Sequence, residues 1–259
     1  MMAEISACRR CAGHGDRRNI EARQPPRRPA IKLKIEPLTR ATWPDLVDLF
    51  SRPGLAVARG CYCMYYRRSG RHDRPPGVTY SESNKRALKA LVDHGVVPGL
   101  LGYEGGRAIG WVSLGPREDY AKLARSPVMK PVDDEPVWSI ICFVVDPSVR
   151  RKGVAEAMLR GALAWARKRG VALVEAYPCD KPKRAADDSM WFGAKRMFDR
   201  AGFSEVARRK PTRPIVRKRI GRGGGRPAAA AVDLHPGRAS GSRGKPRARV
   251  RPTSKGAAS

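Results

Sequence analysis

The sequence predicts an α/β fold in which helices flank a mixed central sheet. Three observations support this expectation. The nearly continuous apolar run Val137–Val145 is typical of a strand buried on both faces. A stretch with apolar residues at helical spacing follows, from Val154 to Ala166. The next apolar run, Val171–Tyr177, then predicts a strand parallel to the first, because strand–helix–strand crossovers are right-handed.

The segments before this unit supply further strands and helices. Ile31–Glu36 alternates apolar and charged residues, as an edge strand does. Two predicted helices follow, with Thr42 and Ser81 as their caps. The runs Pro98–Tyr103 and Ala108–Leu114 predict a hairpin, because the glycines between them permit a positive φ.

The remaining segments complete the predicted order β-α-α-β-β-β-α-β-α-β. Pro116–Pro136 has the composition of a long polar loop, and loops of that length usually bind ligands or move. Gly170 is expected to end the long helix. Ser189–Ala201 predicts another helix, and short strands up to about Arg219 would close the sheet.

A basic turn separates the central strand from the long helix. Its sequence is Arg150-Arg151-Lys152-Gly153-Val154-Ala155. Backbone N–H groups at a helix start have no intrahelical partner, so they can bind a phosphate group. Gly153 and Ala155 would keep the approach to this backbone open, while the three basic side chains add full positive charge. The turn therefore predicts an anion site.

The pattern Arg150-x-x-Gly153-x-Ala155, preceded by Val145-Asp146-Pro147, resembles the acetyl-coenzyme A motif of the GNAT superfamily of N-acetyltransferases. The segment Ala194–Phe203 resembles the helix and Gly-Phe pair that come later in the same superfamily. The resemblance covers roughly residues 31 to 219. It implies the GNAT fold, with splayed parallel fourth and fifth strands. It also implies acetyl-CoA as co-substrate and acetyl transfer to an amine by direct attack on the thioester.

The resemblance also implies positions for the coenzyme. The pantetheine arm would pair with exposed backbone at the end of the fourth strand, and the pyrophosphate would bind the basic turn. The first group of residues is Phe143, Val144 and Val145, and the second is Arg150, Arg151, Lys152, Gly153, Val154 and Ala155. The side chains of the first group are expected in the core, so only their backbone would be functional.

The acid–base residues cannot be carried over from the family. Phe198 and Trp191 stand where the family often has a Tyr and an Asn, and Phe198 has no proton to give. Glu175 and Tyr177 are the replacement candidates, because they share one face of the fifth strand. A Glu in an apolar strand is costly to bury without partners, which suggests a base or a substrate contact. Two alternatives stay open: an ion pair with a neighbouring Arg for Glu175, and ordinary packing for Tyr177.

Two segments are candidates for acceptor recognition. The block around Cys61, Tyr62 and Tyr65 collects thiols and aromatic rings, and packing or acceptor binding is favoured there over a nucleophilic cysteine. Asp133 and Asp134 could attract a cationic amine, although a solvated charge run explains them equally well.

Composition sets the remaining expectations. The formal charge is +29, and residues 1–30 and 221–259 contain few large apolar side chains, so both ends are predicted to be disordered around a domain at 31–220. We expect these basic ends to bind nucleic acid weakly. We also expect a cytoplasmic monomer or homodimer that holds no metal and does not associate with a membrane. The alternative function is a catalytically weak acyl-CoA sensor or adaptor whose basic tails bind polyanions.

Overall fold

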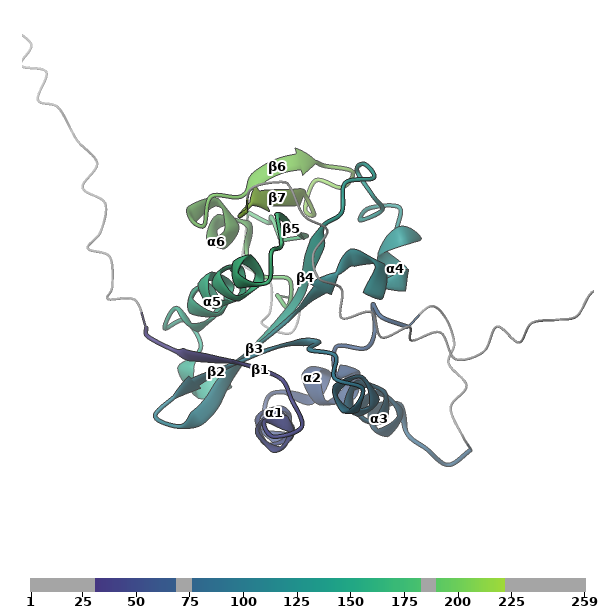
Figure 1. Ribbon diagram of the computed structural model, residues 1–259, viewed down its shortest axis with the longest axis vertical. Helices are drawn as coiled ribbons and strands as arrows, with labels where there is room; N and C mark the ends of the chain where they lie inside the picture. The colour runs from purple at the N-terminus through teal and green to yellow at the C-terminus, as the bar shows by residue number, and fades with distance from the viewer. Residues whose placement is uncertain (1–30, 69–75, 183–189, 222–259) are drawn as a thin grey trace, which may run out of the picture.

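The computed structural model describes residues 31–68, 76–182 and 190–221. The predicted disordered ends, 1–30 and 221–259, lie outside these residues except for Gly221. The described chain folds around one seven-stranded sheet in the order β1-β2-β3-β4-β5-β7-β6 (Figure 1). The strands are β1 (Lys34–Pro37), β2 (Gly99–Glu104), β3 (Arg107–Pro116), β4 (Trp138–Val145), β5 (Leu173–Ala176), β6 (Ser204–Ala207) and β7 (Ile215–Arg219).

The sheet is mixed, as the sequence predicts. Strands β4 and β5 are parallel, and every other neighbouring pair is antiparallel. The parallel pair is in register only where residues 138–140 face 174–176, whereas β4 stays paired with β3 as far as Val145. Beyond Ile140 the two parallel strands therefore diverge, which confirms the expected splay.

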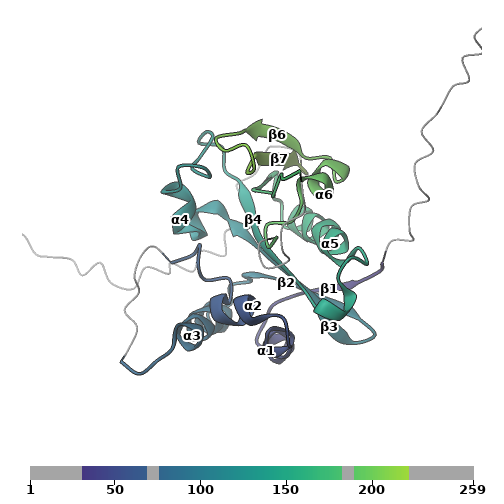
Figure 2. The same cartoon turned by 180° about the vertical axis from the view of Figure 1, so that it is seen from behind.

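Helices cover both faces of the sheet (Figures 1 and 2). One core joins α5 to the sheet through Met158 and Leu159, and a second joins α1 and α3 to the opposite face, where Trp111 is fully buried. A third apolar cluster surrounds Tyr120 and Tyr177 beside the short α4. The helices are α1 (Trp43–Ser51), α2 (Ala56–Cys61), α3 (Tyr80–Asp93), α4 (Ala121–Ala124), α5 (Val154–Lys168) and α6 (Lys195–Arg200), with 3₁₀ turns at Arg117–Asp119 and Pro147–Val149.

Two predicted boundaries need correction. Helix α3 is capped by Thr79 rather than Ser81, because the Thr79 hydroxyl accepts the Glu82 N–H at 3.2 Å. Helix α6 is much shorter than Ser189–Ala201. The segment before it, residues 190–194, instead crosses the splayed strands, where Cys179 N–H donates to the carbonyl of Gly193 at 2.8 Å.

The hairpin and the end of α5 are as predicted. Gly105 and Gly106 both have positive φ in the two-residue turn between β2 and β3. Gly170 has φ 76° just after α5, and its N–H donates to the carbonyl of Arg167. Helix α5 therefore ends at a defined residue, and its N-terminus lies where β4 and β5 diverge.

Candidate active site

The basic turn leads from β4 into the N-terminus of α5. Gly153 is the N-cap, with φ 88° in the left-handed region, and Arg151 also has positive φ. The first intrahelical bond runs from Ala157 N–H to the carbonyl of Gly153 at 3.0 Å. The N–H groups of the three preceding residues therefore have no acceptor within the helix, as an anion site requires.

Charged contacts hold this turn against the first helices. Arg52, after α1, donates from Nη1 to Asp146 Oδ2 at 2.5 Å and to the carbonyl of Ala108 at 2.7 Å. Asp146 also accepts the Ser148 N–H at 2.9 Å and its hydroxyl at 2.7 Å. Burial raises the pKa of Asp146, but the bonds from Ser148 and Arg52 outweigh it and lower the pKa below its usual value. Asp146 is therefore ionised at neutral pH and fixes the start of the turn.

Arg52→Ala should weaken acetyl-CoA binding by about tenfold, or roughly 1.4 kcal/mol. The substitution leaves the buried Asp146 carboxylate without its closest guanidinium, so the turn loses its fixed geometry. Calorimetric titration would measure the effect. Arg86→Ala is the matched control, because Arg86 forms an exposed pair with Glu82 on α3 and should leave the affinity unchanged. Equal affinities in the two variants would contradict the role assigned to Arg52.

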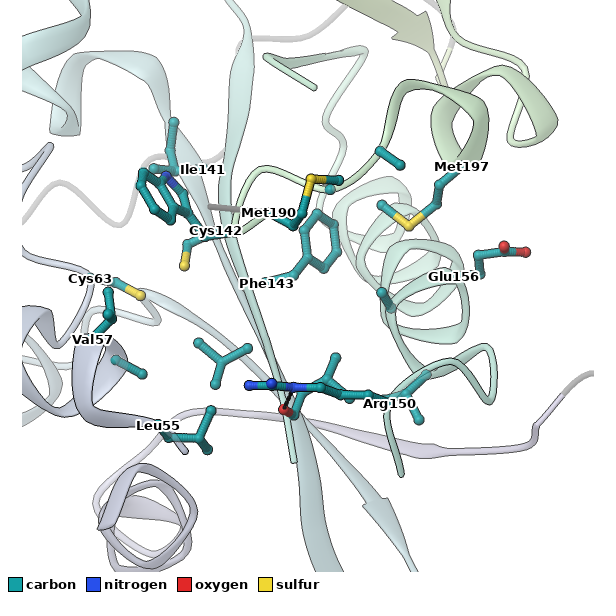
Figure 3. A pocket seen from close by; sticks show the side chains of 18 of the residues that line it. Leu55, Val57, Cys63, Ile141, Cys142, Phe143, Arg150, Glu156, Met190 and Met197 are labelled. Atoms are coloured by element: carbon teal, nitrogen blue, oxygen red, sulfur yellow. Dashed lines mark hydrogen bonds between the residues drawn. The ribbon is translucent and has the colours of Figure 1, made fainter. Parts of the chain in front are cut away.

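A cavity of about 810 Å³ opens from this turn along the splayed end of β4 (Figure 3). One end is formed by the turn and the N-terminus of α5. The other end is formed by residues at and after the end of α2 and by the segment that crosses the strands. The residues at this other end are Cys61, Cys63, Tyr65, Tyr66, Met190 and Trp191. A single space thus joins the predicted anion site to the predicted acceptor block.

The residues predicted to bind the coenzyme are brought together, with one change. All of them line the cavity except Lys152. The backbone N–H of Phe143 is already engaged, because it donates to the Trp191 carbonyl at 2.6 Å. Phe143 therefore contributes its ring, which packs on Phe198, while the Val145 carbonyl accepts Arg150 Nε at 3.4 Å.

The end of the cavity at the basic turn is strongly basic. Arg196 and Arg200 from α6 line it together with Arg150 and Arg151, although no sequence pattern pointed to the first two. Among the described residues that line the cavity, Glu156 carries a carboxylate, and this carboxylate is paired with Arg200. This end therefore suits a ligand with several negative charges.

Glu175 and Tyr177 share one face, as predicted, but the structure does not bring them to the cavity. Glu175 is 0% exposed and pairs with Arg117 at 3.1 Å and Arg217 at 2.7 Å. Tyr177 donates to Glu175 Oε1 at 2.5 Å. Burial and the Glu175 charge raise the pKa of Tyr177 well above its usual value. The ion-pair alternative for Glu175 is the one observed, since this face of β5 points toward Arg117 and away from α5.

The acceptor candidates separate into two groups. Cys61 and Tyr65 line the cavity. Tyr65 is 56% exposed, and Lys122 Nζ lies 3.5 Å from the centroid of its ring. Tyr62 does not reach the cavity. Its left-handed backbone at the end of α2 turns the ring toward Phe50 and Trp43, where it is buried.

The acidic pair also lies elsewhere. Asp133 binds Arg217 at 2.7 Å, and this bond lowers the pKa of its carboxyl. Asp134 is exposed beside it, and neither residue lines the cavity. The expected attraction of a cationic amine by this pair therefore has no support in the geometry.

A model of the acetyltransferase (GNAT) family matches residues 64–203, which is more than half of the chain and includes β4, the basic turn and α6. The chain belongs to the GNAT acetyltransferase family. Acetyl-CoA is the acetyl donor of this GNAT family. The basic turn is open enough for such a ligand to approach, because a Cβ added at Gly153 would meet only Ile31, at 4.0 Å.

Solved structures of other acetyltransferases resemble this GNAT chain at low identity. PaiA N-acetyltransferase from Thermoplasma acidophilum, in complex with coenzyme A, is 14% identical over 73% of this chain and 99% of its own, with a TM-score of 0.40. The ribosomal-protein-S18-alanine N-acetyltransferase of Escherichia coli is 14% identical over 74% and 97%, with a TM-score of 0.37. No curated protein matches the sequence. Within the described residues, no helix has the length and apolarity needed to cross a membrane.

Proposed function

We propose that this protein transfers the acetyl group of acetyl-CoA to the nitrogen of an amine. The observation that carries the proposal is the single cavity that runs from the basic turn, the predicted phosphate site, to the aromatic block of Tyr65, Tyr66 and Trp191. Four arginines at one end match the charge of the coenzyme, and an apolar channel past Phe143 suits its uncharged arm. Positioning of two reactants in one cavity supplies much of the rate in such a transfer.

The proton on the leaving sulfur needs a different source from the family's usual Tyr. Phe198 stands at that position and is 0% exposed. Tyr66 lines the cavity, and burial raises its pKa to about 12, so it remains a phenol at neutral pH. A phenol with that pKa cannot protonate a thiolate fully, since a thiol has a pKa of about 8.5, but it can donate a hydrogen bond to it. Water then supplies the proton.

The residues that line the cavity favour an acceptor molecule that is apolar or acidic apart from its amine group. Tyr65, Tyr66 and Trp191 place aromatic rings at the end of the cavity away from the basic turn, and Lys122 Nζ lies 3.5 Å from the centre of the Tyr65 ring. The carboxylate described in the lining, Glu156, is occupied by Arg200. A polycationic amine would find no free counter-charge among these residues.

The test is release of free thiol from acetyl-CoA with a panel of amines. The panel should contain aryl-alkylamines, peptides with a free N-terminus, and polyamines. We expect amine-dependent thiol release, with an acetamide product detected by mass spectrometry, for one of the first two classes. Binding of acetyl-CoA without amine-dependent release across the panel would reject the proposed activity.

A further inference from the structure

Lys122 lies beside the end of the cavity that is distant from the basic turn. Its Nζ is 3.5 Å from the centroid of the Tyr65 ring, and its backbone N–H donates to the carbonyl of Tyr66 at 3.1 Å. Both tyrosines line the cavity, although Lys122 itself does not. The backbone bond fixes the start of α4 against this segment, so the ammonium group stays at the rim of the cavity. The transfer proposed above gives this group no role.

The positive charge of Lys122 is not used by the fold. Among the residues that the structure describes, Lys122 forms no ion pair with a carboxylate. Asp119, the nearest carboxylate in the chain, is bound by Arg67 at 2.9 Å. Glu156 lines the other end of the cavity and is paired with Arg200. The charge of Lys122 is therefore available to a ligand.

The surroundings of Lys122 also reduce its contact with water. The residue is half-buried, and burial lowers the pKa of its ammonium group, while the nearby Cys61, which lines the cavity, opposes this shift. An ammonium that has lost part of its hydration and has no carboxylate partner gains more from an anion than a fully hydrated one does. Lys122 thus differs from an ordinary solvated surface lysine.

The same end of the cavity keeps apolar side chains exposed. Val57 on α2 and Tyr65 are both exposed, and both line the cavity. Figure 3 shows Val57 together with Cys63 on one side of the cavity and Glu156 on the opposite side. Exposed apolar side chains that gather at a cavity are typical of a binding site. A ligand at this end would place an apolar part against Val57 and Tyr65 and an anionic group at Lys122.

We propose that Lys122 determines acceptor specificity by binding a carboxylate of the acceptor molecule. This inference rests on the proposed function and narrows its acceptor class to amines that carry both a carboxylate and an apolar part. A free apolar amino acid or a short peptide has these three groups. Lys122 touches no reacting atom, so it selects and orients the acceptor and takes no part in the bond changes.

The transfer itself remains a direct attack. The neutral amine attacks the acetyl carbonyl, the carbon–nitrogen bond forms, and the bond to the coenzyme sulfur breaks. The proton of the amine passes to water, and the leaving thiolate takes a proton from water. Binding of the carboxylate at the rim restricts the orientations of the amine, and such restriction favours the reaction of two bound molecules.

The test compares acceptors that differ in their carboxylate. The pairs are phenylalanine with phenethylamine, leucine with isoamylamine, and glycylphenylalanine with its C-terminal amide. Thiol release from acetyl-CoA by the full chain gives kcat/KM for each acceptor. We expect at least one pair in which the carboxylate-bearing member is preferred by about tenfold or more, mainly through a lower KM.

Variants of Lys122 assign this preference to its charge. Lys122→Met removes the ammonium and keeps an unbranched apolar chain over Tyr65, so it should abolish the preference while kcat/KM for the uncharged member and the affinity for acetyl-CoA stay unchanged. Lys122→Arg keeps the charge and should retain most of the preference. Lys89→Met is the matched control, because Lys89 also lies over a ring, that of Trp43 at 5.9 Å, but is paired with Asp93 away from the cavity. The ratio within a pair cancels the intrinsic reactivity of each amine, as in a double-mutant cycle.

An inhibitor tests binding of the carboxylate without turnover. Phenylpropionate keeps the ring and the carboxylate of phenylalanine and lacks the amine. It should inhibit competitively against the preferred acceptor, and inhibition should weaken by about tenfold in Lys122→Met. Equal inhibition of the two proteins would contradict carboxylate binding by Lys122.

The outcomes separate this inference from the proposed function. Equal use of both members of every pair, or a preference that Lys122→Met leaves intact, would overturn the role of Lys122 while the transferase assignment stands. Acetylation confined to amines without a carboxylate would do the same. Absence of amine-dependent thiol release with all of these acceptors and with the wider amine panel would overturn both.

Discussion

Gly153→Glu is expected to abolish acetyl-CoA binding while the protein stays folded. A glutamate at this N-cap places a side chain and a negative charge where the pyrophosphate would meet the first N–H groups of α5. The substitution does not disturb the core, because a Cβ at Gly153 meets only Ile31 at 4.0 Å. The positive φ of 88° adds a strain of about 1–3 kcal/mol, which a domain of this size tolerates.

Gly170→Glu is the matched control for this prediction. Gly170 follows the other end of the same helix, has φ 76°, and a Cβ there has no neighbour within 4 Å. Both variants therefore introduce the same residue in the same backbone conformation, and the melting temperature should fall by a similar amount in both. Only Gly153→Glu should lose coenzyme binding in calorimetry. Unchanged affinity in a folded Gly153→Glu protein would show that the turn is not the phosphate site.

Glu175→Gln is expected to destabilise the fold by about 3–5 kcal/mol rather than to remove a catalytic base. Glu175 is the shared partner of Arg117, Arg217 and the Tyr177 hydroxyl. Arg217 already has one buried nitrogen, Nη2, without a hydrogen-bond partner in the described structure. Loss of the carboxylate charge would leave two nearly buried guanidinium groups poorly compensated.

Thermal melting checks the Glu175 prediction. A loss of this size should lower the melting temperature by roughly 6–20 °C, and the folded fraction should bind acetyl-CoA with normal affinity. Glu135→Gln is the control, because Glu135 forms an exposed pair with Arg219 on the same strand that carries Arg217, and such pairs contribute little. Normal melting combined with a large loss of turnover would restore an acid–base role to Glu175.

The sequence by itself was sufficient for the fold class, and it predicted most of the residues that line the cavity at the basic turn. Both depend on local patterns: a continuous apolar run predicts β4, helical spacing predicts α5, and a basic turn with Gly153 between them predicts the anion site. Because these patterns are local, they do not predict correctly where α3 begins or where α6 begins. Residues 190–194 form no helix, since their backbone groups bond to Phe143 and Cys179, which are distant in sequence.

Only the tertiary structure determined which side chains meet at the reacting end. Alternation along β5 correctly put Glu175 and Tyr177 on one face, but it carries no information on what that face meets, and Arg117 and Arg217 meet it. Likewise, only the fold brings the indole N–H of Trp111 on β3 to Cys63. A pKa depends on charges and donors within a few ångströms. The packing of β5 against β7, and of the segment after α2 against β3 and β4, brings these groups together, and no local pattern encodes it.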